Sequence, residues 1–451
     1  MSGPRATSRA VIAERTAASQ TRRDFLRSAA VVTAATLADV RTPAHASTLS
    51  TPARVHMLGR RSAPHIIVVG AGAFGGWTAL SLLRKGARVT LVDAWGAGNS
   101  RSSSGDETRI IRSMYAGNVP YTRMATRALH LWKDAERQWG RRVFHRTGAL
   151  YLFEGDDAPA TTSVPVMRAM QIPIDELTLA EARRRWPQIR FDGVKSVYFE
   201  PDAGYLLSRA SCEMVRESFV AEGGAYRLAA AKPGRVVSGK MQGAVLDDGS
   251  LLEGDAYVFA CGPWLGQLFP SLIGPGIEAT RQDVIYLGVA PGESPFAESR
   301  FPVWVNFGER VTYGIPGNDR RGFKVADDTA GSPLDPTTAS RIISEDALRI
   351  ARDIVARRFP GLVNAPVVET RVCQYEYSPD GDFLLDRHPG AANTWIIGGG
   401  SGHGFKMGPA LGEYVTGLVM DDGTPDAQFA WEHFATGLAR LKANGGRGVH
   451  K

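Results

Sequence analysis

Apolar residues occur along this chain in short unbroken runs, which are separated by glycine-rich turns and longer amphipathic segments. The first run, His65–Val69, is rich in β-branched residues, a pattern typical of a strand buried on both faces of a parallel sheet. Residues 76–84 then have helical composition, and a second apolar run over residues 87–92 ends in Asp93. This order predicts a strand–helix–strand unit of an α/β protein.

The pattern after this unit predicts a mixture of further helices and strands. We expect helices over residues 121–139, 344–359 and 409–419, and strands over residues 257–260, 284–288, 303–307, 311–315, 370–377 and 395–397. The helix over residues 344–359 has a charged face, as expected at a solvent-exposed surface. No internal repeat is evident, so the sequence does not indicate a solenoid or a propeller.

The first 46 residues have the features of an export signal. A twin-arginine sequence, Thr21-Arg22-Arg23-Asp24-Phe25-Leu26-Arg27, precedes a modest apolar stretch over residues 28–38 and the small-x-small sequence Ala44-His45-Ala46. We therefore expect residues 1–46 to be a twin-arginine signal peptide and residues 47–63 a linker. The translocon would then be a transient partner, and the protein would be periplasmic or extracellular. The alternative is a basic amphipathic helix that stays attached.

Composition excludes several classes of protein and partner. The chain has 451 residues, 43% of them hydrophobic and 22% charged, which is ordinary for a globular protein. Its net charge of +7 is concentrated at the front, where residues 1–46 hold seven arginines and three acidic residues, so we expect no nucleic-acid partner. Three cysteines without close spacing predict neither a disulfide framework nor a metal site. No segment is apolar enough to predict stable membrane insertion.

The turn between the first strand and helix has the glycine pattern of a dinucleotide-binding site. In Gly70-Ala71-Gly72-Ala73-Phe74-Gly75, Gly70 permits a tight turn, Gly72 lets the backbone approach a pyrophosphate, and Gly75 lets the helix pack on the strand. Asp93 follows Gly70 by 23 residues, where a carboxylate can bind ribose hydroxyls. These residues predict a dinucleotide cofactor and do not by themselves distinguish NAD from FAD.

A motif after the second strand indicates a family. The segment Ser102-Ser103-Ser104-Gly105-Asp106-Glu107-Thr108-Arg109-Ile110-Ile111-Arg112 resembles the FAD-proximal loop of the monomeric sarcosine oxidase and N-methyltryptophan oxidase family, a branch of the D-amino-acid-oxidase-like flavoproteins. Other landmarks follow in the family order: Phe259-Ala260-Cys261-Gly262-Pro263-Trp264, Thr312-Tyr313-Gly314-Ile315-Pro316, Gly322-Phe323-Lys324, Cys373-Gln374-Tyr375, and Gly400-Ser401-Gly402-His403-Gly404-Phe405-Lys406. The likeness covers residues 64–430 approximately and implies FAD as the cofactor.

The resemblance also implies an architecture. A Rossmann-type FAD-binding domain of the glutathione-reductase kind would be interleaved with a substrate domain built on an antiparallel sheet. We assign residues 64–144, 205–278 and 369–437 to the FAD-binding domain and residues 145–204 and 279–368 to the substrate domain. Residues 438–451 would form a C-terminal tail, and we expect a monomer.

The resemblance implies roles for the cations of these motifs. Arg109 would lie beside the flavin, and Arg112 and Lys406 would bind the substrate carboxylate, to which guanidinium is well matched. Because Arg109 and Arg112 are three residues apart, they would share one face of a helical turn. Lys324 would lie over the flavin N5 face and promote the reaction with O2, with Tyr313 lining the substrate site. Ser103, Gly262, Gly402 and Gly404 would contact the cofactor.

Cys373 matches the family cysteine that forms a thioether to the flavin, although a lone cysteine in a strand is otherwise often a small core residue. The chain also departs from the family. Sarcosine oxidases carry histidine beside the position of Ser104 or Gly105, where this chain has serines and one extra residue. They carry a second histidine four residues after the lysine, where this chain has Asp328. We hypothesise that Asp328 binds an amine or hydroxyl of a substrate larger than sarcosine.

Together these features predict an FAD-dependent amine oxidase. It would oxidise the C–N bond of an N-methyl or other secondary amino acid to an imine and reduce O2 to H2O2. Two alternatives remain open from the sequence. One is an amino-acid dehydrogenase that passes electrons to a quinone or a carrier protein, and the other is a non-catalytic exported FAD-binding protein.

Overall fold

The computed structural model describes residues 63–289, 294–318 and 321–443, whose contacts form one compact unit. The predicted signal peptide and residues 47–62 of the predicted linker lie outside the described residues, as do the last residues of the predicted tail. Among the described helices, none is long and apolar enough to cross a membrane.

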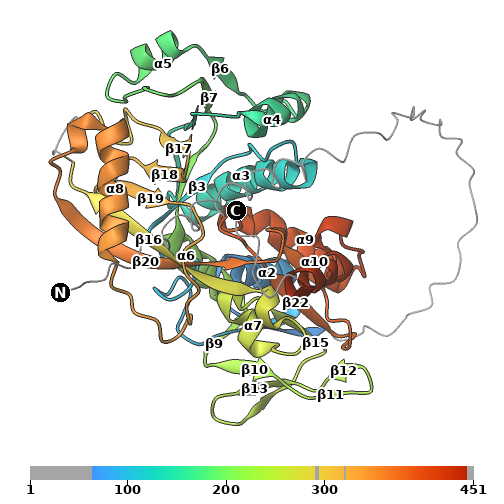
Figure 1. Cartoon of the computed structure of the whole chain (residues 1–451). Coiled ribbons are helices and arrows are strands. Elements are labelled where there is room, and N and C mark those ends of the chain that lie inside the picture. Colours follow the sequence, from blue (N-terminus) through green and yellow to red (C-terminus); the bar gives the residue numbers. More distant parts are fainter. Residues whose placement is uncertain (1–62, 290–293, 319–320, 444–451) are drawn as a thin grey trace, which may run out of the picture. The chain divides into compact units, whose positions relative to one another are not determined.

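The two strands of the predicted strand–helix–strand unit belong to a six-stranded sheet (Figure 1). Its order is β21 (Leu384–Arg387), β22 (Thr394–Gly398), β15 (Ala256–Phe259), β1 (His65–Val69), β2 (Arg88–Asp93) and β9 (Ala225–Leu228). All neighbouring strands are parallel except β21 and β22. The strands of this sheet come from the three stretches of chain that were assigned to the FAD-binding domain, residues 64–144, 205–278 and 369–437.

Four helices pack together on one face of this sheet. Helix α2 (Ala73–Arg84) begins three residues earlier than predicted and packs with α9 (Gly408–Met420), which in turn contacts α3 (Val119–Trp139). Helix α6 (Ser208–Ala221) also contacts α2. Buried aromatic and aliphatic side chains of these helices form one core with β1 and β2, which includes the fully buried Trp132. This packing fixes the amino ends of α2 and α9 relative to the sheet.

The opposite face carries smaller elements. These are α7 (Leu265–Leu268), α10 (Trp431–Ala443), a sheet of β10 (Ala231–Pro233), β13 (Ala244–Leu246) and β14 (Leu251–Leu252), and the hairpin of β11 (Val236–Val237) and β12 (Lys240–Met241). Helix α10 extends into the residues assigned to the C-terminal tail, which begins at residue 438.

An eight-stranded sheet forms the second large layer. Its order is β20 (Val367–Tyr377), β16 (Glu278–Leu287), β19 (Phe323–Asp327), β18 (Val311–Ile315), β17 (Val303–Phe307), β5 (Ala149–Phe153), β7 (Ser196–Glu200) and β6 (Asp175–Leu177). Every pair is antiparallel except β17 with β5. The antiparallel sheet is thus confirmed, with one parallel pair.

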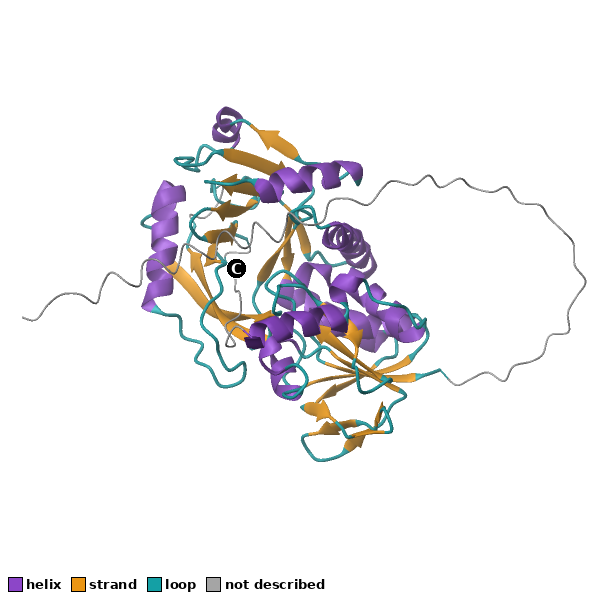
Figure 2. Cartoon of the chain, turned by 45° about the vertical axis from the view of Figure 1, so that its right-hand side comes forward, coloured by secondary structure: helices purple, strands orange, loops and turns teal. Residues whose placement is uncertain are grey.

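Three further helices accompany this sheet: α4 (Ala158–Ala169), α5 (Leu179–Arg185) and α8 (Glu345–Arg358). Figure 2 shows the strands of the sheets in orange and the helices in purple. Helix α8 covers one face through Ala351, Ile354 and Val355, and Ser344 caps its first turn by accepting a hydrogen bond from the Ala347 N–H at 3.1 Å. The predicted amphipathic helix is confirmed.

Two features of the predicted layout differ from the structure. Strand β20 belongs to the eight-stranded sheet, although residues from 369 onward were assigned to the FAD-binding domain; the domain boundaries themselves remain a prediction. The predicted helical turn carrying Arg109 and Arg112 is wrong. Residues Thr108–Ile111 form strand β3, which pairs antiparallel with β8 (Gly204–Leu207), and β8 also pairs with β4 (Phe144–Arg146). The two β-branched isoleucines favour this strand.

Candidate cofactor and substrate site

A cavity extends along the carboxyl ends of β1, β2 and β15. It is lined by eight of the residues predicted to contact the cofactor: Gly70, Gly72, Asp93, Ser103, Arg109, Gly262, Gly402 and Gly404. The segments 102–104, 229–231 and 260–264 also line it, as do Tyr375, Glu376 and Phe405. The carboxyl edge of a parallel sheet is the usual position of a dinucleotide in this class of fold.

The glycine turn has the tight geometry that the sequence predicts. Gly70 has φ +104°, and a Cβ there would lie 2.3 Å from the carbonyl oxygen of Ala260. A Cβ at Gly75 would lie 1.9 Å from the Gly70 oxygen, so Gly75 serves helix packing rather than the cavity wall. Side chains are therefore excluded at both positions, and the amino end of α2 reaches the cavity through Ala73.

Asp93 is held in place at the end of β2. Its carboxylate accepts hydrogen bonds from the backbone N–H groups of Ala71 at 2.7 Å, Trp95 at 2.9 Å and Gly96 at 2.8 Å. Burial raises the pKa of Asp93, and these hydrogen bonds oppose that shift. This arrangement fits the ribose of a dinucleotide, since the carboxylate both closes the glycine turn and lines the cavity.

At the other end of the cavity, the loop after β22 leads into helix α9. Gly402 has φ +78° and faces the Tyr375 ring. Gly404 and Phe405 also line the cavity; Phe405 is the first residue of the short turn η5 (Phe405–Met407), which α9 follows directly. A second helix amino end therefore faces the cavity, where its partial positive charge favours an electron-rich group. Two helix amino ends, a glycine turn and the Asp93 carboxylate together fit FAD.

The buried carboxylate of Asp106 connects the cations near this end. It forms ion pairs with the Lys324 ammonium and with the Arg109 guanidinium, the latter at 2.9 Å, and it accepts a hydrogen bond from the Tyr286 hydroxyl at 2.9 Å. Asp106 and Lys324 are 3% and 1% exposed. Burial acts to raise the pKa of Asp106, but Lys324 and Arg109 hold it well below its usual range. The carboxylate is thus ionised and supplies the counter-charge of both cations. Burial lowers the pKa of Lys324, and Asp106 opposes that shift.

Cys373 lies on β20 against Arg109. The Arg109 Nη2 is 3.2 Å from the Cys373 Sγ, and the same nitrogen donates a hydrogen bond to the Ser103 carbonyl at 2.6 Å. Burial disfavours the charged guanidinium, yet Cys373 and Asp106 raise the pKa of Arg109. Cys373 is 6% exposed and is not among the cavity-lining residues, whereas its contacts Arg109 and Ser103 are.

Arg112 and Lys406 meet at one aromatic ring. The Arg112 guanidinium carbon is 4.7 Å from the centroid of Tyr115, and the Lys406 ammonium donates a hydrogen bond to the Tyr115 hydroxyl at 2.9 Å. Lys406 also donates to the His403 carbonyl at 2.8 Å and is 5% exposed. Burial and Arg112 lower the pKa of Lys406 well below its usual value. A half-buried arginine and a buried lysine are therefore held close together, an arrangement that favours binding of an anion.

Acidic and phenolic groups adjoin these two cations. The Tyr375 hydroxyl donates to Asp328 Oδ1 at 2.8 Å and lies 3.4 Å from the Tyr313 hydroxyl. Burial raises the pKa of Asp328 to about 6, although Tyr375, Arg112 and Lys406 act to lower it. Glu200 accepts hydrogen bonds from the Ser113 N–H at 2.9 Å and the Tyr151 hydroxyl at 2.8 Å. The cluster holds both signs of charge, as a zwitterionic amino acid requires.

Several of these residues had no role in the sequence analysis. Asp106 lies inside the recognised motif and Tyr375 lies two residues after Cys373, so the sequence places both near the site. It does not show which residues they contact. Glu200 and Tyr115 carried no signal, because β7 and the segment after β3 meet only in the folded chain.

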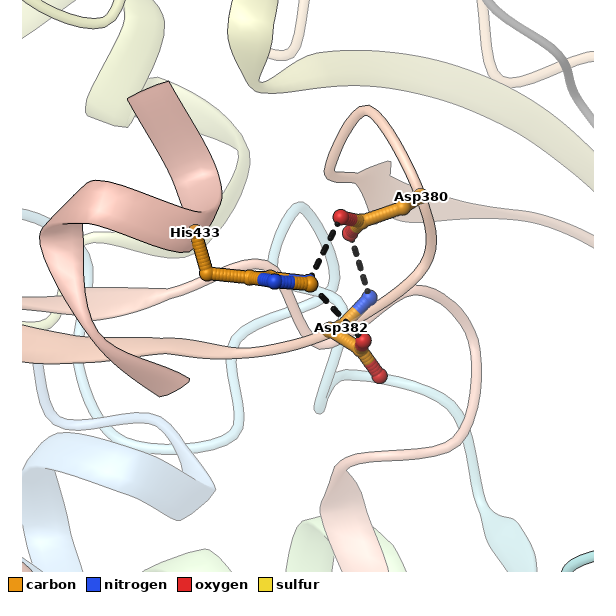
Figure 3. A group of neighbouring side chains, drawn as sticks. All are labelled: Asp380, Asp382 and His433. Carbon is orange, nitrogen blue, oxygen red and sulfur yellow. Dashed lines mark hydrogen bonds and ion pairs between the residues drawn. The ribbon is translucent and has the colours of Figure 1, made fainter. Parts of the chain in front are cut away.

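One acidic group of the described residues has the composition of a metal site. Asp380 and Asp382, before β21, face His433 at the start of α10 (Figure 3). The His433 Nε2 is 2.8 Å from an Asp380 oxygen and 3.2 Å from an Asp382 oxygen. These side chains are partly exposed, and their mutual ion pairs account for the grouping. The expectation that the chain holds no metal remains a prediction.

Replacement of Asp106 by asparagine is expected to destabilise the fold. The variant would leave Lys324 and Arg109 buried without their shared counter-charge, which costs about 3–5 kcal/mol in comparable pairs. Asp421→Asn, which removes an exposed partner of Lys85, should cost no more than about 1 kcal/mol. Urea unfolding at neutral pH measures both. Equal unfolding free energies for the two variants would show that Asp106 does not hold the buried cations.

Comparisons with known proteins agree with this geometry. Residues 65–418 match the family model DAO, described as FAD dependent oxidoreductase. The chain is 28% identical to monomeric sarcosine oxidase of Bacillus sp. (strain B-0618) over 79% of this chain and 92% of that protein. It is 25% identical to N-methyl-L-tryptophan oxidase of Salmonella arizonae over 79% and 94%.

Solved structures share the fold. L-proline dehydrogenase from P. horikoshii superposes with a TM-score of 0.73 at 20% identity, covering 83% of this chain and 99% of that one. Fructosamine oxidase from Aspergillus fumigatus superposes with a TM-score of 0.70 at 22% identity, covering 83% and 91%. The resemblance to sarcosine and N-methyltryptophan oxidases is thus confirmed, and the chain belongs to the DAO family of FAD-dependent oxidoreductases.

Proposed function

We propose that this protein oxidises the C–N bond of an N-methyl or other secondary amino acid to an imine and reduces O2 to H2O2. The observation that carries the proposal is the meeting of the half-buried Arg112 and the buried Lys406 on Tyr115, beside the end of the FAD cavity. Relatives named sarcosine oxidase and N-methyl-L-tryptophan oxidase support the same substrate class.

The two cations would hold the substrate by its carboxylate. A guanidinium offers paired donors that match a planar carboxylate, and an ammonium adds a third donor. A carboxylate fixed in this way has its amine and α-carbon in a restricted position, which lowers the entropic part of the barrier. Bound FAD supplies the redox chemistry by accepting a hydride equivalent from the substrate.

Lys324 would serve the reaction with O2. Reduction of O2 develops negative charge, and a preorganised buried cation stabilises such charge more than solvent does. Asp106 supports this role because its carboxylate pairs with the ammonium at 1% exposure and opposes the lowering of the Lys324 pKa by burial. The ammonium is also fixed in position, because Lys324 donates a second hydrogen bond to the Thr108 carbonyl at 3.1 Å.

We further propose that Cys373 attaches FAD covalently. The bond would replace one S–H and one C–H bond by a C–S bond, and the two electrons and two protons released would reduce O2 to H2O2. The support is the position of the Cys373 thiol, whose sulfur lies 3.2 Å from the guanidinium of Arg109, a residue of the cavity wall.

Asp328 would select the substrate. Its partly exposed carboxylate lies close enough to Arg112 and Lys406 for their charges to affect its ionisation, and it accepts a hydrogen bond from Tyr375. A second amine or a hydroxyl on the substrate would find an acceptor here while the carboxylate binds the cations. We also propose that residues 1–46 direct the folded, FAD-loaded protein to export through the twin-arginine pathway.

Removal of the Arg112 guanidinium should impair catalysis with carboxylate-bearing substrates. A peroxide assay over N-methyl and other secondary amino acids identifies the best substrate, and Arg112→Met should lower its kcat/KM by about 10- to 100-fold, the usual loss for a charged hydrogen bond. Arg127→Met, which removes an exposed ion pair with Glu413, is the control and should be unchanged. If amines without a carboxylate react as well as amino acids in the wild type, the carboxylate-binding role is excluded.

Substitution of Cys373 tests the covalent bond. After acid precipitation, flavin should remain with the wild-type polypeptide and with Cys212→Ala, whose buried thiol lies on α6, but should be released from Cys373→Ala. Absorbance of the pellet and supernatant distinguishes the two. Free flavin from the wild type would exclude a covalent bond while leaving FAD dependence intact.

Asp328 predicts a pH dependence with a defined sign. Its acceptor form increases as pH rises through about 6, so kcat/KM for substrates with a second amine should increase over that interval and then level off. Asp328→Asn should abolish the increase, Asp328→His should reorder the preferred substrates, and Asp346→Asn on α8 should change neither. An unaltered substrate ranking in Asp328→His would rule out the selecting role.

A further inference from the structure

A second carboxyl group lies in the wall of the FAD cavity and has no part in the chemistry above. Glu376 is on β20, three residues after Cys373, and is 7% exposed. Alternation along the strand directs Cys373 and Tyr375 to one side and Glu376 to the other. Glu376 Oε1 accepts a hydrogen bond from the Gly400 N–H at 3.1 Å, whereas Oε2 is buried with no hydrogen-bond partner among the described residues.

Backbone closes on this carboxyl from two sides. A Cβ at Gly262, which has φ +52°, would lie 2.6 Å from Oε2, and a Cβ at Gly400 would lie 2.9 Å from Oε1. Both glycines also line the cavity. The side chain is therefore confined between the turn after β15 and the loop after β22, and Glu376 forms part of the cavity wall. A buried oxygen without a hydrogen-bond partner costs free energy, so a ligand atom that pairs with Glu376 Oε2 would remove this cost.

The electrical environment favours the neutral acid. Burial raises the pKa of Glu376 to about 7, and the one opposing influence is the Gly400 N–H. The other ionisable groups of the cavity wall are the Cys261 thiol, the Asp93 carboxyl, the Arg109 guanidinium and the Tyr375 phenol. Arg109 contacts Asp106 and Cys373, and among the described residues Glu376 forms no ion pair with a cation. An anionic diphosphate would repel a carboxylate here, but a neutral carboxyl can donate a proton to it.

We propose that Glu376 binds FAD as a neutral carboxylic acid and donates an O–H hydrogen bond from Oε2 to an oxygen of the ribityl–diphosphate chain. Glu376 is thus a cofactor-positioning residue. The proposal requires only that the chain bind FAD, as its family does, and it is independent of the amine substrate and of the bond to Cys373.

This assignment couples FAD binding to a proton. If FAD binds the neutral form, its affinity falls as pH rises above the pKa of the carboxyl in the free protein, and binding at alkaline pH takes up a proton. Asp328 also titrates near this interval, with a pKa of about 6. Since Asp328 is present in both proteins of the comparison below, a difference between them belongs to Glu376.

The test uses FAD-free protein carrying Cys373→Ala, so that binding stays reversible, with and without Glu376→Gln. The Kd for FAD is measured by flavin fluorescence at about pH 6 and about pH 8.5, an interval in which the protein with Glu376 should lose at least about tenfold in affinity. The glutamine amide keeps a donor and cannot ionise, so Glu376→Gln should bind equally well at both pH values. The exposed Glu253→Gln is the matched control and should retain the pH dependence.

Proton uptake gives an independent readout. Calorimetry near pH 8.5 in buffers of different ionisation enthalpy should show uptake of about one proton per FAD bound, and none with Glu376→Gln. Equal pH dependence and equal uptake in the two proteins would overturn the proposal, as would a Glu376→Gln variant that is folded by circular dichroism but weak at every pH. If that variant does not fold, absence of uptake in the protein with Glu376 overturns it.

Discussion

The ion pairs of Asp106 are the interaction on which the site depends. One buried carboxylate holds the Lys324 ammonium and the Arg109 guanidinium, and each of these cations serves a different neighbour. Lys324 is the cation proposed to serve the reaction with O2, while Arg109 reaches Cys373 and the cavity wall. Charges this deeply buried are tolerated only when paired and hydrogen-bonded. Loss of the carboxylate would therefore affect the fold, the oxygen site and the cofactor environment together.

Strand β20 carries chemistry on both of its faces. Cys373 and Tyr375 lie toward Arg109, Tyr313 and Asp328, on the side where the substrate would bind. Gln374 and Glu376 lie on the opposite side, where Glu376 enters the cavity wall. Because β20 pairs with β16 along nearly its whole length, its register fixes all four side chains at once. A shift of one residue would exchange the two faces.

The sequence was informative where function depends on local geometry. The strand, the glycine turn and Asp93 follow rules that act over a few residues, and the structure has them as predicted. Arg109 and Arg112 show where prediction from local sequence fails. A three-residue spacing suggested a helical turn, but pairing with β8, about a hundred residues later in the chain, makes the segment a strand. Arg109 and Arg112 consequently contact different groups. The partnership of Asp106 with Lys324 spans 218 positions, and no local pattern encodes it.

We propose that Lys324, paired with Asp106, makes this protein an oxidase rather than a dehydrogenase. Simultaneous measurement of O2 consumed, H2O2 formed and secondary amino acid oxidised by the purified wild-type protein tests it most directly. We expect the three quantities to be equal without any added electron acceptor. Oxidation of the amino acid that requires a quinone or a dye, with the O2 concentration unchanged, would contradict it.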